Sequence, residues 1–444
     1  MIGEVEISSP REIAQKVLMS RKALNSWATM GLDHRIKHIE KLIDAFDKKQ
    51  TYLASLMSQE MGMPITQAVD DMKYGIEFLH WYCDNAHTYL DPEITYDDAK
   101  EIHRVFREPR GVVALIVPWN FPFSNFVWGA GQSLVCGNTI IFKHSEETPL
   151  FGKAIEDIFL SAEFPIGVFS EVYGAGEVGK LLVHEDIDMI CFTGSTKTGQ
   201  YLYSVAAQKL IPILMELGGS APGLVFEDAD VDKILGNIYT NRFTNCGQMC
   251  DALKRLIVHE SKMEEVIAKL TKLIENKKVG EAGDHTTDIG PLVAKRQLIT
   301  LEKQIEDAIE KGAKIITGGN KPSHLAGAYY NPTLLTHITR DMKIWKEEVF
   351  GPILPIISFQ TEAEAIELAN DTQYGLGGYI FTENKEKFLG VSSQLKTGMI
   401  SQNNISYVRA CNPFGGYKKS GLGREHGQYG FHELTQVKVI SSEK

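Results

Sequence analysis

From Gly111 onward, short continuous apolar runs alternate with helical segments, and this alternation most strongly limits what the chain can fold into. Runs such as 112–117 (VVALIV) and 139–142 (TIIF) have the length and continuity of strands buried on both faces. The series ends near Met215 and predicts a doubly wound α/β domain with a parallel sheet. Its predicted strands are 112–117, 139–142, 168–173, 189–192 and 211–215, and helices follow from about 148, 176 and 196.

A second alternating series begins after residues 216–219 (ELGG) and predicts a second α/β domain. A chain of 444 residues is too long for one compact core, and its length is typical of two or three domains. The predicted helices of this series are 229–244, 260–276, 297–311, 361–370 and 384–395, and its predicted strands are 254–258, 313–316, 353–359, 377–381 and 398–402.

The residues before Gly111 predict helices and a hairpin. Ser9-Pro10-Arg11-Glu12 has the form of a capping box with proline at the first helical position. A second helix follows Asp33, a third covers about 66–89, and the polar stretch 91–107 predicts a protruding hairpin. The tail from Phe431 to Ser442 predicts a final strand, which could pair with that hairpin or with another subunit.

Composition and charge exclude several classes of protein. The net charge of -11 makes nucleic acid or an anionic membrane an unexpected partner. No apolar run reaches the length of a membrane span, and the first residues lack the features of a secretory signal. Six cysteines in this length are no disulfide framework and indicate a reducing compartment, so we expect a cytoplasmic protein.

The stretch 245–250 (NCGQMC) places two thiols four residues apart, at Cys246 and Cys250. A cysteine in such a protein is ordinarily a small buried hydrophobe, and C-x-x-x-C fits no common zinc or thioredoxin pattern. None of the 13 histidines has metal-binding spacing, and no Gly-x-Ser-x-Gly motif occurs. We therefore expect neither a metal centre nor a serine hydrolase.

Two glycine-rich turns could bind phosphate at a helix N-terminus: 174–179 (GAGEVG) and Gly194-Ser195. The first matches G-x-G-x-x-G, which is a weak signal alone and could be a plain tight turn. Lys143 and Glu146, just after a buried strand, could bind the hydroxyls of a ribose or simply form a solvated turn.

Two further polar residues follow predicted strands. Asn120 lies between two prolines in PWNFP and could donate to an oxyanion, or could be a satisfied residue in a rigid turn. Glu216 follows a strand and precedes two glycines. It could be a general base or a helix N-cap.

Seven motifs then occur in one order: PWNFP (118–122), KHSEETP (143–149), FTGS (192–195), ELGGSAP (216–222), GQMC (247–250), EEVFGP (347–352) and PFGGYKKSGLGRE (413–425). In this order and spacing they resemble the aldehyde dehydrogenase superfamily over nearly the whole chain. KH, ELGGS, Lys254-Arg255 and the PFGG segment are similar to its succinate-semialdehyde branch, whereas the loop 407–412 is not a close match.

The resemblance implies a Rossmann-type NAD-binding domain (1–90 and 109–217), an α/β catalytic domain (218–420) and a small β oligomerisation element (91–108 and 431–444). It implies a homodimer or homotetramer. Cys250 matches the family's catalytic nucleophile, Glu216 its general base and Asn120 its oxyanion donor. The cofactor residues would be Trp119, Lys143, Glu146, Gly194, Ser195, Glu348 and Phe350. The G-x-G-x-x-G match at 174–179 would then not be the pyrophosphate turn. The substrate residues would be Phe121, Phe414 and Arg409.

The implied reaction oxidises an aldehyde to a carboxylic acid. Cys250 would attack the carbonyl, hydride would pass to nicotinamide, and Glu216 would activate the water that hydrolyses the thioester. The family's coenzyme-A-acylating members lack a glutamate at the ELGG position, so Glu216 favours hydrolysis over acyl transfer to coenzyme A. A third alternative is a catalytically silent binding or structural protein on the same fold.

Glu146 favours NAD because its charge would repel a 2′-phosphate, while Lys143 leaves NADP open. The substrate is expected to be a small aliphatic aldehyde or semialdehyde, such as succinate semialdehyde. Arg409 could bind a substrate carboxylate or be an exposed loop residue.

Three features depart from the family pattern or add to it. Gly129 stands where many members carry a lysine, and His144 replaces a common proline. Cys246 raises the hypothesis that oxidation bridges it to Cys250, if the backbone allows the required separation.

Overall fold

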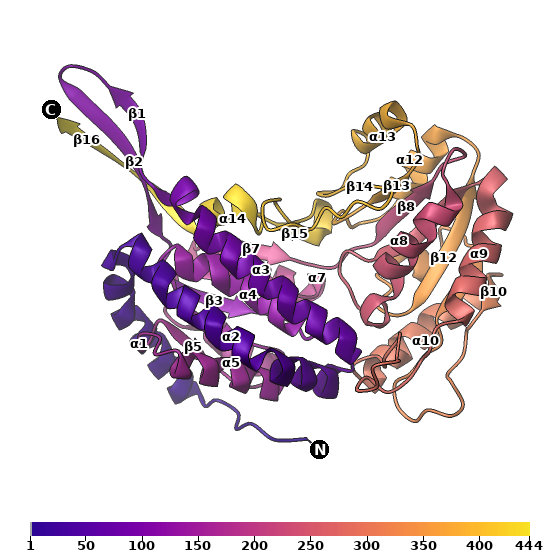
Figure 1. Cartoon of the computed structure of the whole chain (residues 1–444), viewed down its shortest axis with the longest axis horizontal. Helices are drawn as coiled ribbons and strands as arrows, with labels where there is room; N and C mark the ends of the chain where they lie inside the picture. The colour runs from indigo at the N-terminus through magenta and orange to yellow at the C-terminus, as the bar shows by residue number, and fades with distance from the viewer. Residues whose placement is uncertain (1) are drawn as a thin grey trace.

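The computed structural model describes residues 2–444 and arranges their strands in three sheets (Figure 1). Two of the sheets belong to two lobes that lie side by side. The third forms a narrow arm that projects from the first lobe and carries the C-terminus (Figure 1). This α/β architecture confirms the predicted fold class.

The first lobe contains a six-stranded sheet with the order β15-β7-β6-β3-β4-β5. All its neighbouring strands pair in parallel except β15 with β7. Its strand order reverses between β3 and β6, where ligands of such sheets usually bind. The strands are β3 (Val112–Ile116), β4 (Thr139–Lys143), β5 (Phe169–Glu171), β6 (Met189–Thr193), β7 (Ile213–Glu216) and β15 (Gly421–Leu422).

Helices cover both faces of this sheet, because alternate strand residues point to opposite sides. Val113 and Leu115 pack in a core with α2, α3, α4 and α5, whereas Val112 and Ala114 pack in a second core with α1, α6 and α7. The helices are α1 (Pro10–Thr29), α2 (Leu32–Met61), α3 (Ile65–Leu90), α4 (Pro122–Val135), α5 (Pro149–Ser161), α6 (Gly176–His184) and α7 (Thr196–Lys209).

The second lobe contains a seven-stranded sheet with the order β10-β11-β12-β9-β8-β13-β14, in which only β10 pairs antiparallel. The predicted elements all appear close to their predicted bounds. The strands are β8 (Ala221–Val225), β9 (Leu253–His259), β10 (Lys314–Thr317), β11 (Thr333–Thr336), β12 (Ile353–Phe359), β13 (Tyr379–Phe381) and β14 (Ser401–Gln402), and the helices are α8 (Val231–Phe243), α9 (Met263–Glu275), α10 (Lys295–Glu310), α11 (Lys343–Lys346), α12 (Glu362–Asn370) and α13 (Lys385–Ser392).

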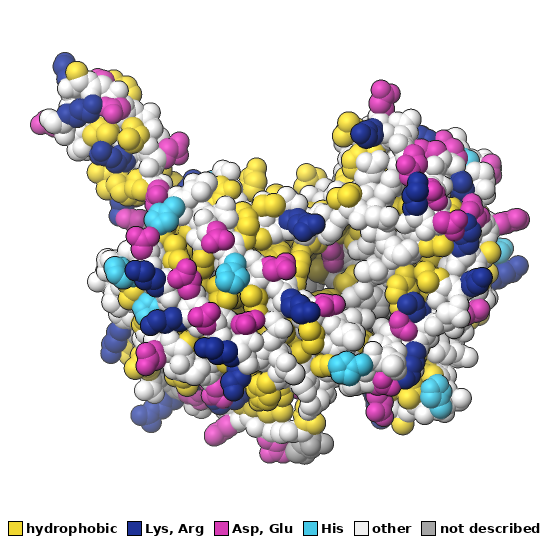
Figure 2. Space-filling view, in the orientation of Figure 1, with side chains coloured by type: hydrophobic (Ala, Val, Ile, Leu, Met, Phe, Trp, Pro, Cys, Tyr) yellow, Lys and Arg dark blue, Asp and Glu magenta, His cyan; other side chains and the backbone are white. Residues whose placement is uncertain are grey.

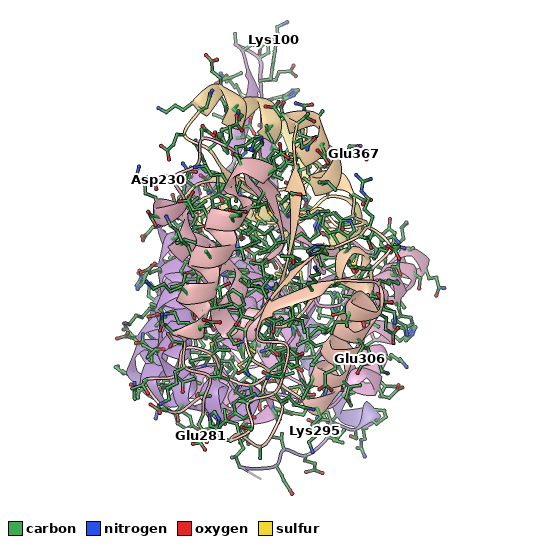
Figure 3. The ribbon with its side chains drawn as sticks, turned by 90° about the vertical axis from the view of Figure 1, so that its right-hand side faces the viewer. Lys100, Asp230, Glu281, Lys295, Glu306 and Glu367 are labelled. Atoms are coloured by element: carbon green, nitrogen blue, oxygen red, sulfur yellow. The ribbon has the colours of Figure 1, made fainter. Side chains whose placement is uncertain are left out.

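The arm is a three-stranded antiparallel sheet of β1 (Glu93–Asp97), β2 (Glu101–Pro109) and β16 (Thr435–Glu443). The C-terminal strand therefore pairs with the hairpin, which settles the choice that the sequence left open. It begins later than predicted, because residues 427–433 form helix α14 (Gly427–Glu433). Figure 3 shows Lys100 at the tip of the arm, and Figure 2 shows apolar side chains on its surface.

Two absences hold for residues 2–444. No helix in this range is long and apolar enough to span a bilayer. No two of the six cysteines in this range are joined by a disulfide.

Candidate active site

A cavity of about 880 Å³ lies between the two lobes, at the carboxyl edge of the first sheet. Figure 2 shows the hollow that separates the lobes on this face. The loops after β3 and β6 contribute Asn120 and Gly194, and Glu216 ends β7. The second lobe contributes Cys250 and Glu348 to the same wall. The cavity therefore lies at the reversal of strand order.

A tight left-handed turn precedes Cys250. Asn245, Cys246 and Gly247 have φ angles of 50°, 56° and 73°, in a short 3₁₀ segment (Thr244–Gly247) after α8. The left-handed region costs free energy at residues other than glycine, and such strain persists only where surrounding contacts impose it. The loop that carries the predicted nucleophile is thus held in one conformation by its neighbours.

Side-chain hydrogen bonds supply that constraint. The Asn245 amide donates to the carbonyl oxygen of Asn120 at 2.6 Å, and the main-chain N–H of Asn245 donates to Gln67 Oε1 at 2.7 Å. Gln248 Oε1 accepts from the main-chain N–H of Val293 at 3.0 Å. These contacts join the nucleophile loop to both lobes.

The two thiols of this loop have different surroundings. Cys246 is buried in the core of the second lobe, among residues of α8 and β9. Cys250 lines the cavity and packs against Leu376, Met399 and Phe414. Because the side chains pack in different clusters, the structure gives no support to the hypothesis of a bridge between them.

The environment of Cys250 does not by itself produce a thiolate. Burial raises the pKa of the Cys250 thiol, and the neighbouring carboxylate of Asp251 raises it further, while the ammonium of Lys254 acts in the opposite direction. A cysteine that acts as nucleophile here needs a base to take its proton.

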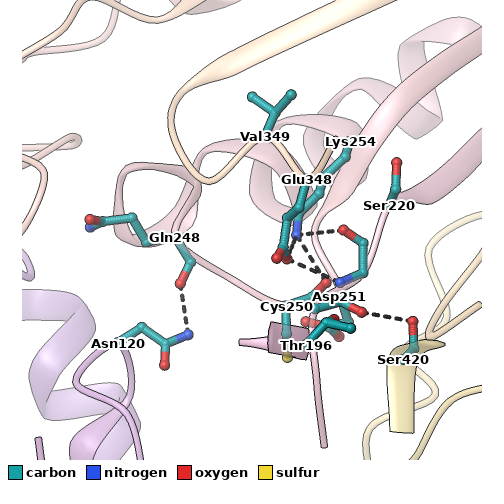
Figure 4. Close-up of polar contacts among 12 residues, drawn as sticks. Asn120, Thr196, Ser220, Gln248, Cys250, Asp251, Lys254, Glu348, Val349 and Ser420 are labelled. Carbon is teal, nitrogen blue, oxygen red and sulfur yellow. Dashed lines mark hydrogen bonds and ion pairs between the residues drawn. The ribbon is translucent and has the colours of Figure 1, made fainter. Parts of the chain in front are cut away.

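Asn120 is 6% exposed, and its contacts fix the orientation of its amide. Nδ2 donates to the carbonyl oxygen of Gln248 at 2.9 Å, and Oδ1 accepts from Asn125 at 3.3 Å (Figure 4). A primary amide has two N–H groups, so the second remains for a ligand in the cavity. This arrangement suits an oxyanion donor beside Cys250.

Glu216 is the last residue of β7, and it is a strand residue rather than a helix N-cap. Its side chain is buried and lines the cavity, and neither carboxylate oxygen has a hydrogen-bond partner among residues 2–444. Burial raises the pKa of Glu216, and the nearby carboxylate of Glu425 raises it further. A carboxylate with a raised pKa and no partner is suited to accept a proton near neutral pH.

Glu348 and Phe350 reach the cavity from the loop before β12. Glu348 Oε1 pairs with the buried ammonium of Lys254 and accepts from the main-chain N–H of Gly219 at 3.0 Å. Trp119 meets the Phe350 ring edge to face, with centroids 5.8 Å apart. Glu348, Phe350 and Trp119 therefore lie together in the wall of the cavity.

The remaining predicted cofactor residues separate into two groups. Gly194 and Ser195 line the cavity at the N-terminus of α7, where Ser195 caps the helix by accepting from Thr198 N at 3.3 Å. Lys143 and Glu146 do not line it. Lys143 is buried and donates to the His144 carbonyl oxygen at 3.0 Å, and Glu146 is exposed. The 174–179 segment also lies outside the cavity lining.

The substrate side of the cavity carries the predicted residues Phe121, Phe414 and Arg409, of which Arg409 is exposed. It also carries Asp251, which the sequence reasoning missed although it directly follows Cys250. The Tyr407 hydroxyl donates to Asp251 Oδ2 at 3.2 Å.

The family comparison agrees with this geometry. A model of the aldehyde dehydrogenase family matches residues 1–440. The chain belongs to the aldehyde dehydrogenase family. It is 35% identical to a mitochondrial succinate-semialdehyde dehydrogenase of Oryza sativa, an alignment that covers 99% of this chain and 84% of the relative. It is 33% identical to a glutarate-semialdehyde dehydrogenase of Pseudomonas aeruginosa over 99% of this chain and 91% of the relative.

A solved aldehyde dehydrogenase has nearly the same fold. The NAD+ complex of an aldehyde dehydrogenase from Bacillus cereus matches with a TM-score of 0.95 and 35% identity. The match covers 98% of this chain and 90% of that one. The two-lobed architecture with its arm is therefore that of an aldehyde dehydrogenase.

The position where many aldehyde dehydrogenases carry a lysine is closed in this member. A Cβ on Gly129, inside α4, would clash with the Leu115 side chain of β3. We expect Gly129→Ala to lower the free energy of unfolding by about 1–3 kcal/mol, because the overpacking exceeds the gain in helix propensity. Urea unfolding measures this change. Gly236→Ala in α8 is the control, since a Cβ there would have open space around it beyond its own helix backbone. Equal or greater stability of Gly129→Ala would contradict the prediction.

Proposed function

We propose that this chain oxidises a small aliphatic aldehyde or semialdehyde, such as succinate semialdehyde, to the carboxylic acid with NAD. One observation carries the proposal. Cys250, Glu216 and Asn120 line a single cavity, together with the Gly194–Ser195 turn and Glu348. A thiol, an unpaired buried carboxylate and a fixed amide donor are the groups that nucleophilic oxidation of an aldehyde needs.

The residues around the cavity suit a nicotinamide dinucleotide. The N-terminus of α7 offers main-chain N–H groups to a pyrophosphate, and a Cβ at Gly194 would clash with the ring of Phe192. Glu348 has one oxygen, Oε2, without a hydrogen bond to residues 2–444 and could accept from ribose hydroxyls. When bound, the nicotinamide supplies the acceptor for hydride. The negative charge of Glu146 favours NAD over NADP.

The side chains of the cavity divide the chemistry among them. Cys250 Sγ loses its proton to water and bonds to the aldehyde carbon. The free N–H of Asn120 stabilises the oxyanion that forms. After oxidation to the thioester, Glu216 takes a proton from water, whose oxygen attacks the acyl carbon. The acid leaves, and the sulfur of Cys250 is released.

The substrate class rests on the relatives and on Arg409. The named relatives act on succinate and glutarate semialdehydes, whose carboxylate an arginine could bind. Asp251 lies on the same wall, so recognition of an anionic tail depends on Arg409. The test is a steady-state panel of aldehydes, including succinate semialdehyde and propanal, with NAD and NADP compared.

We expect Arg409→Ala to lower kcat/KM for succinate semialdehyde by about 10-fold, the size of one charge-assisted hydrogen bond. Propanal has no carboxylate and serves as the internal control. If the ratio of kcat/KM for succinate semialdehyde to kcat/KM for propanal is unchanged in Arg409→Ala, Arg409 does not bind the substrate carboxylate. Formation of an acyl-coenzyme A without free acid would overturn hydrolysis in favour of acyl transfer.

The arm supports a proposal of a homodimer or homotetramer. β16 lies at the edge of the arm, with Val437 and Val439 exposed by 63% and 62%. An apolar edge strand is suited to pair with another chain. We expect Val437→Asp with Val439→Asp to leave a folded monomer in analytical ultracentrifugation, whereas Val437→Thr with Val439→Thr keeps the oligomer. If the aspartate variant has the same mass in solution as the wild type, the edge strand β16 is not the interface between chains.

Two further assignments complete the proposal. The three sheets support a division into an NAD-binding domain (1–90 and 109–217), a catalytic domain (218–420) and an oligomerisation element (91–108 and 431–444). The free cysteines support a cytoplasmic location.

A further inference from the structure

Lys254 of β9 is a buried lysine that contacts three parts of the cavity wall. Its Nζ donates to the carbonyl oxygen of Gly219 at 2.9 Å and to that of Cys250 at 3.1 Å. It also forms an ion pair with Glu348 Oε1. Figure 4 shows the Lys254 side chain alongside that of Glu348, with Cys250 below them. One ammonium therefore joins the turn after β7, the nucleophile loop and the loop before β12.

The burial of this charge makes the three contacts necessary. The side chain of Lys254 is 1% exposed, and a buried ammonium is unfavourable unless acceptors satisfy its donors. An ammonium has three N–H groups, and three acceptors are present. A change in any one of the contacts must therefore affect the other two.

Lys254 also matters for the charge balance at Cys250. Asp251, Glu216 and Glu348 all disfavour the thiolate, and Lys254 is the cation that favours it. The pairing with Glu348 offsets much of this positive charge. Hydrogen bonds donated to Glu348 by a ligand would weaken that pairing, because the carboxylate would then be stabilised by other donors.

We propose that Lys254 couples the occupancy of Glu348 to the reactivity of Cys250. Vicinal hydroxyls of a ribose at Glu348 loosen the ion pair between Glu348 and Lys254. The positive charge of the ammonium is then less offset, and it stabilises the Cys250 thiolate more strongly. Lys254 is a positioning residue in this scheme, since it touches neither substrate nor sulfur. The proposal rests on the assignment of Glu348 to the cofactor under the proposed function.

The test measures how fast iodoacetamide alkylates Cys250, followed by mass spectrometry of the Cys250 peptide. ADP-ribose is the probe, because it carries the terminal ribose without a nicotinamide that could cover the thiol. In the wild type we expect ADP-ribose to raise the alkylation rate several-fold. In Lys254→Met the rate without ligand should be lower, and ADP-ribose should no longer change it.

Variants and binding measurements separate the explanations. Lys254→Arg keeps the charge and should restore part of the response, and Lys254→Gln is a second neutral variant in case Lys254→Met does not fold. Lys272→Met, on the exposed side of α9, is the matched control and should respond like the wild type. Calorimetry measures ADP-ribose binding to each protein.

The outcomes distinguish failure of the coupling from failure of the proposed NAD-dependent aldehyde oxidation. If ADP-ribose binds and changes the alkylation rate equally in the wild type and in Lys254→Met, the coupling is wrong and the proposed function stands. If neither NAD nor ADP-ribose binds the wild type, both are overturned. The coupling is supported if ADP-ribose no longer changes the alkylation rate in Lys254→Met but does so again in Lys254→Arg. A merely structural role of Lys254 would not depend on the positive charge that Lys254→Arg keeps.

Discussion

Cys250→Ala should abolish aldehyde-dependent NADH formation, with a loss of about 10⁴-fold or more in kcat. The reason is that no other thiol can replace it. Cys246, four residues earlier, is buried in the core of the second lobe. Absorbance at 340 nm with a saturating aldehyde measures the effect. NAD binding by calorimetry should remain, since Cys250 belongs to the chemistry rather than to the cofactor wall.

Cys246→Ala is the matched control for this experiment. It removes a sulfur of the same loop and should keep kcat within a few-fold, at a stability cost of about 1 kcal/mol for the lost packing. Wild-type turnover in Cys250→Ala would refute the mechanism. An equal loss in both variants would instead indicate that the loop conformation has collapsed.

Glu216→Gln should separate the two halves of the reaction. The amide has the shape of the carboxylate but cannot accept a proton, so the thioester should accumulate and steady-state turnover should fall by about 10²- to 10⁴-fold. A burst of NADH of about one equivalent per active site should precede the slow phase if another group can deprotonate Cys250. Absence of both burst and turnover would assign the first proton transfer to Glu216 as well.

The pH dependence gives an independent reading of Glu216. Burial and the neighbouring Glu425 raise its pKa, so the side chain is protonated and inactive as a base below that value. Wild-type turnover should rise with pH through this raised pKa, well above the range of an ordinary glutamate. Glu216→Gln should lose this acid limb, and Glu264→Gln, exposed on α9, should keep it. The same limb in both variants would assign the titration to another group.

The sequence predicted most elements of the fold, and the misses have physical causes. Helix α4 was not predicted, because it is buried on nearly all sides and so lacks an amphipathic pattern. Strand β8 contains Pro222 and Gly223, which are unfavourable in strands in general. Strand β11 has only four residues. The local pattern of apolar residues therefore did not indicate these three elements.

The candidate site was less accessible to sequence reasoning than the fold. Motif order identified Cys250, Glu216 and Asn120, and the cavity contains all three. Lys254 was noticed as part of a motif but given no role, since its contacts come from Gly219 and Glu348, which are distant in the sequence. Asp251 was missed because nothing in the chain before it indicates which way its side chain points. Long-range contacts, rather than local pattern, define these two residues.

The pairing of β16 with β2 has a consequence for biosynthesis. The hairpin of β1 and β2 is translated before the second lobe, but the strand that completes the sheet is translated only after it. The free edge of β2 is therefore exposed on every nascent chain until β16 has been synthesised. A chaperone that covers this edge, or a change in the rate at which the second lobe is translated, would control how many chains assemble correctly. An affinity tag fused after Lys444 would extend this same strand, so a recombinant protein is better tagged at its other end.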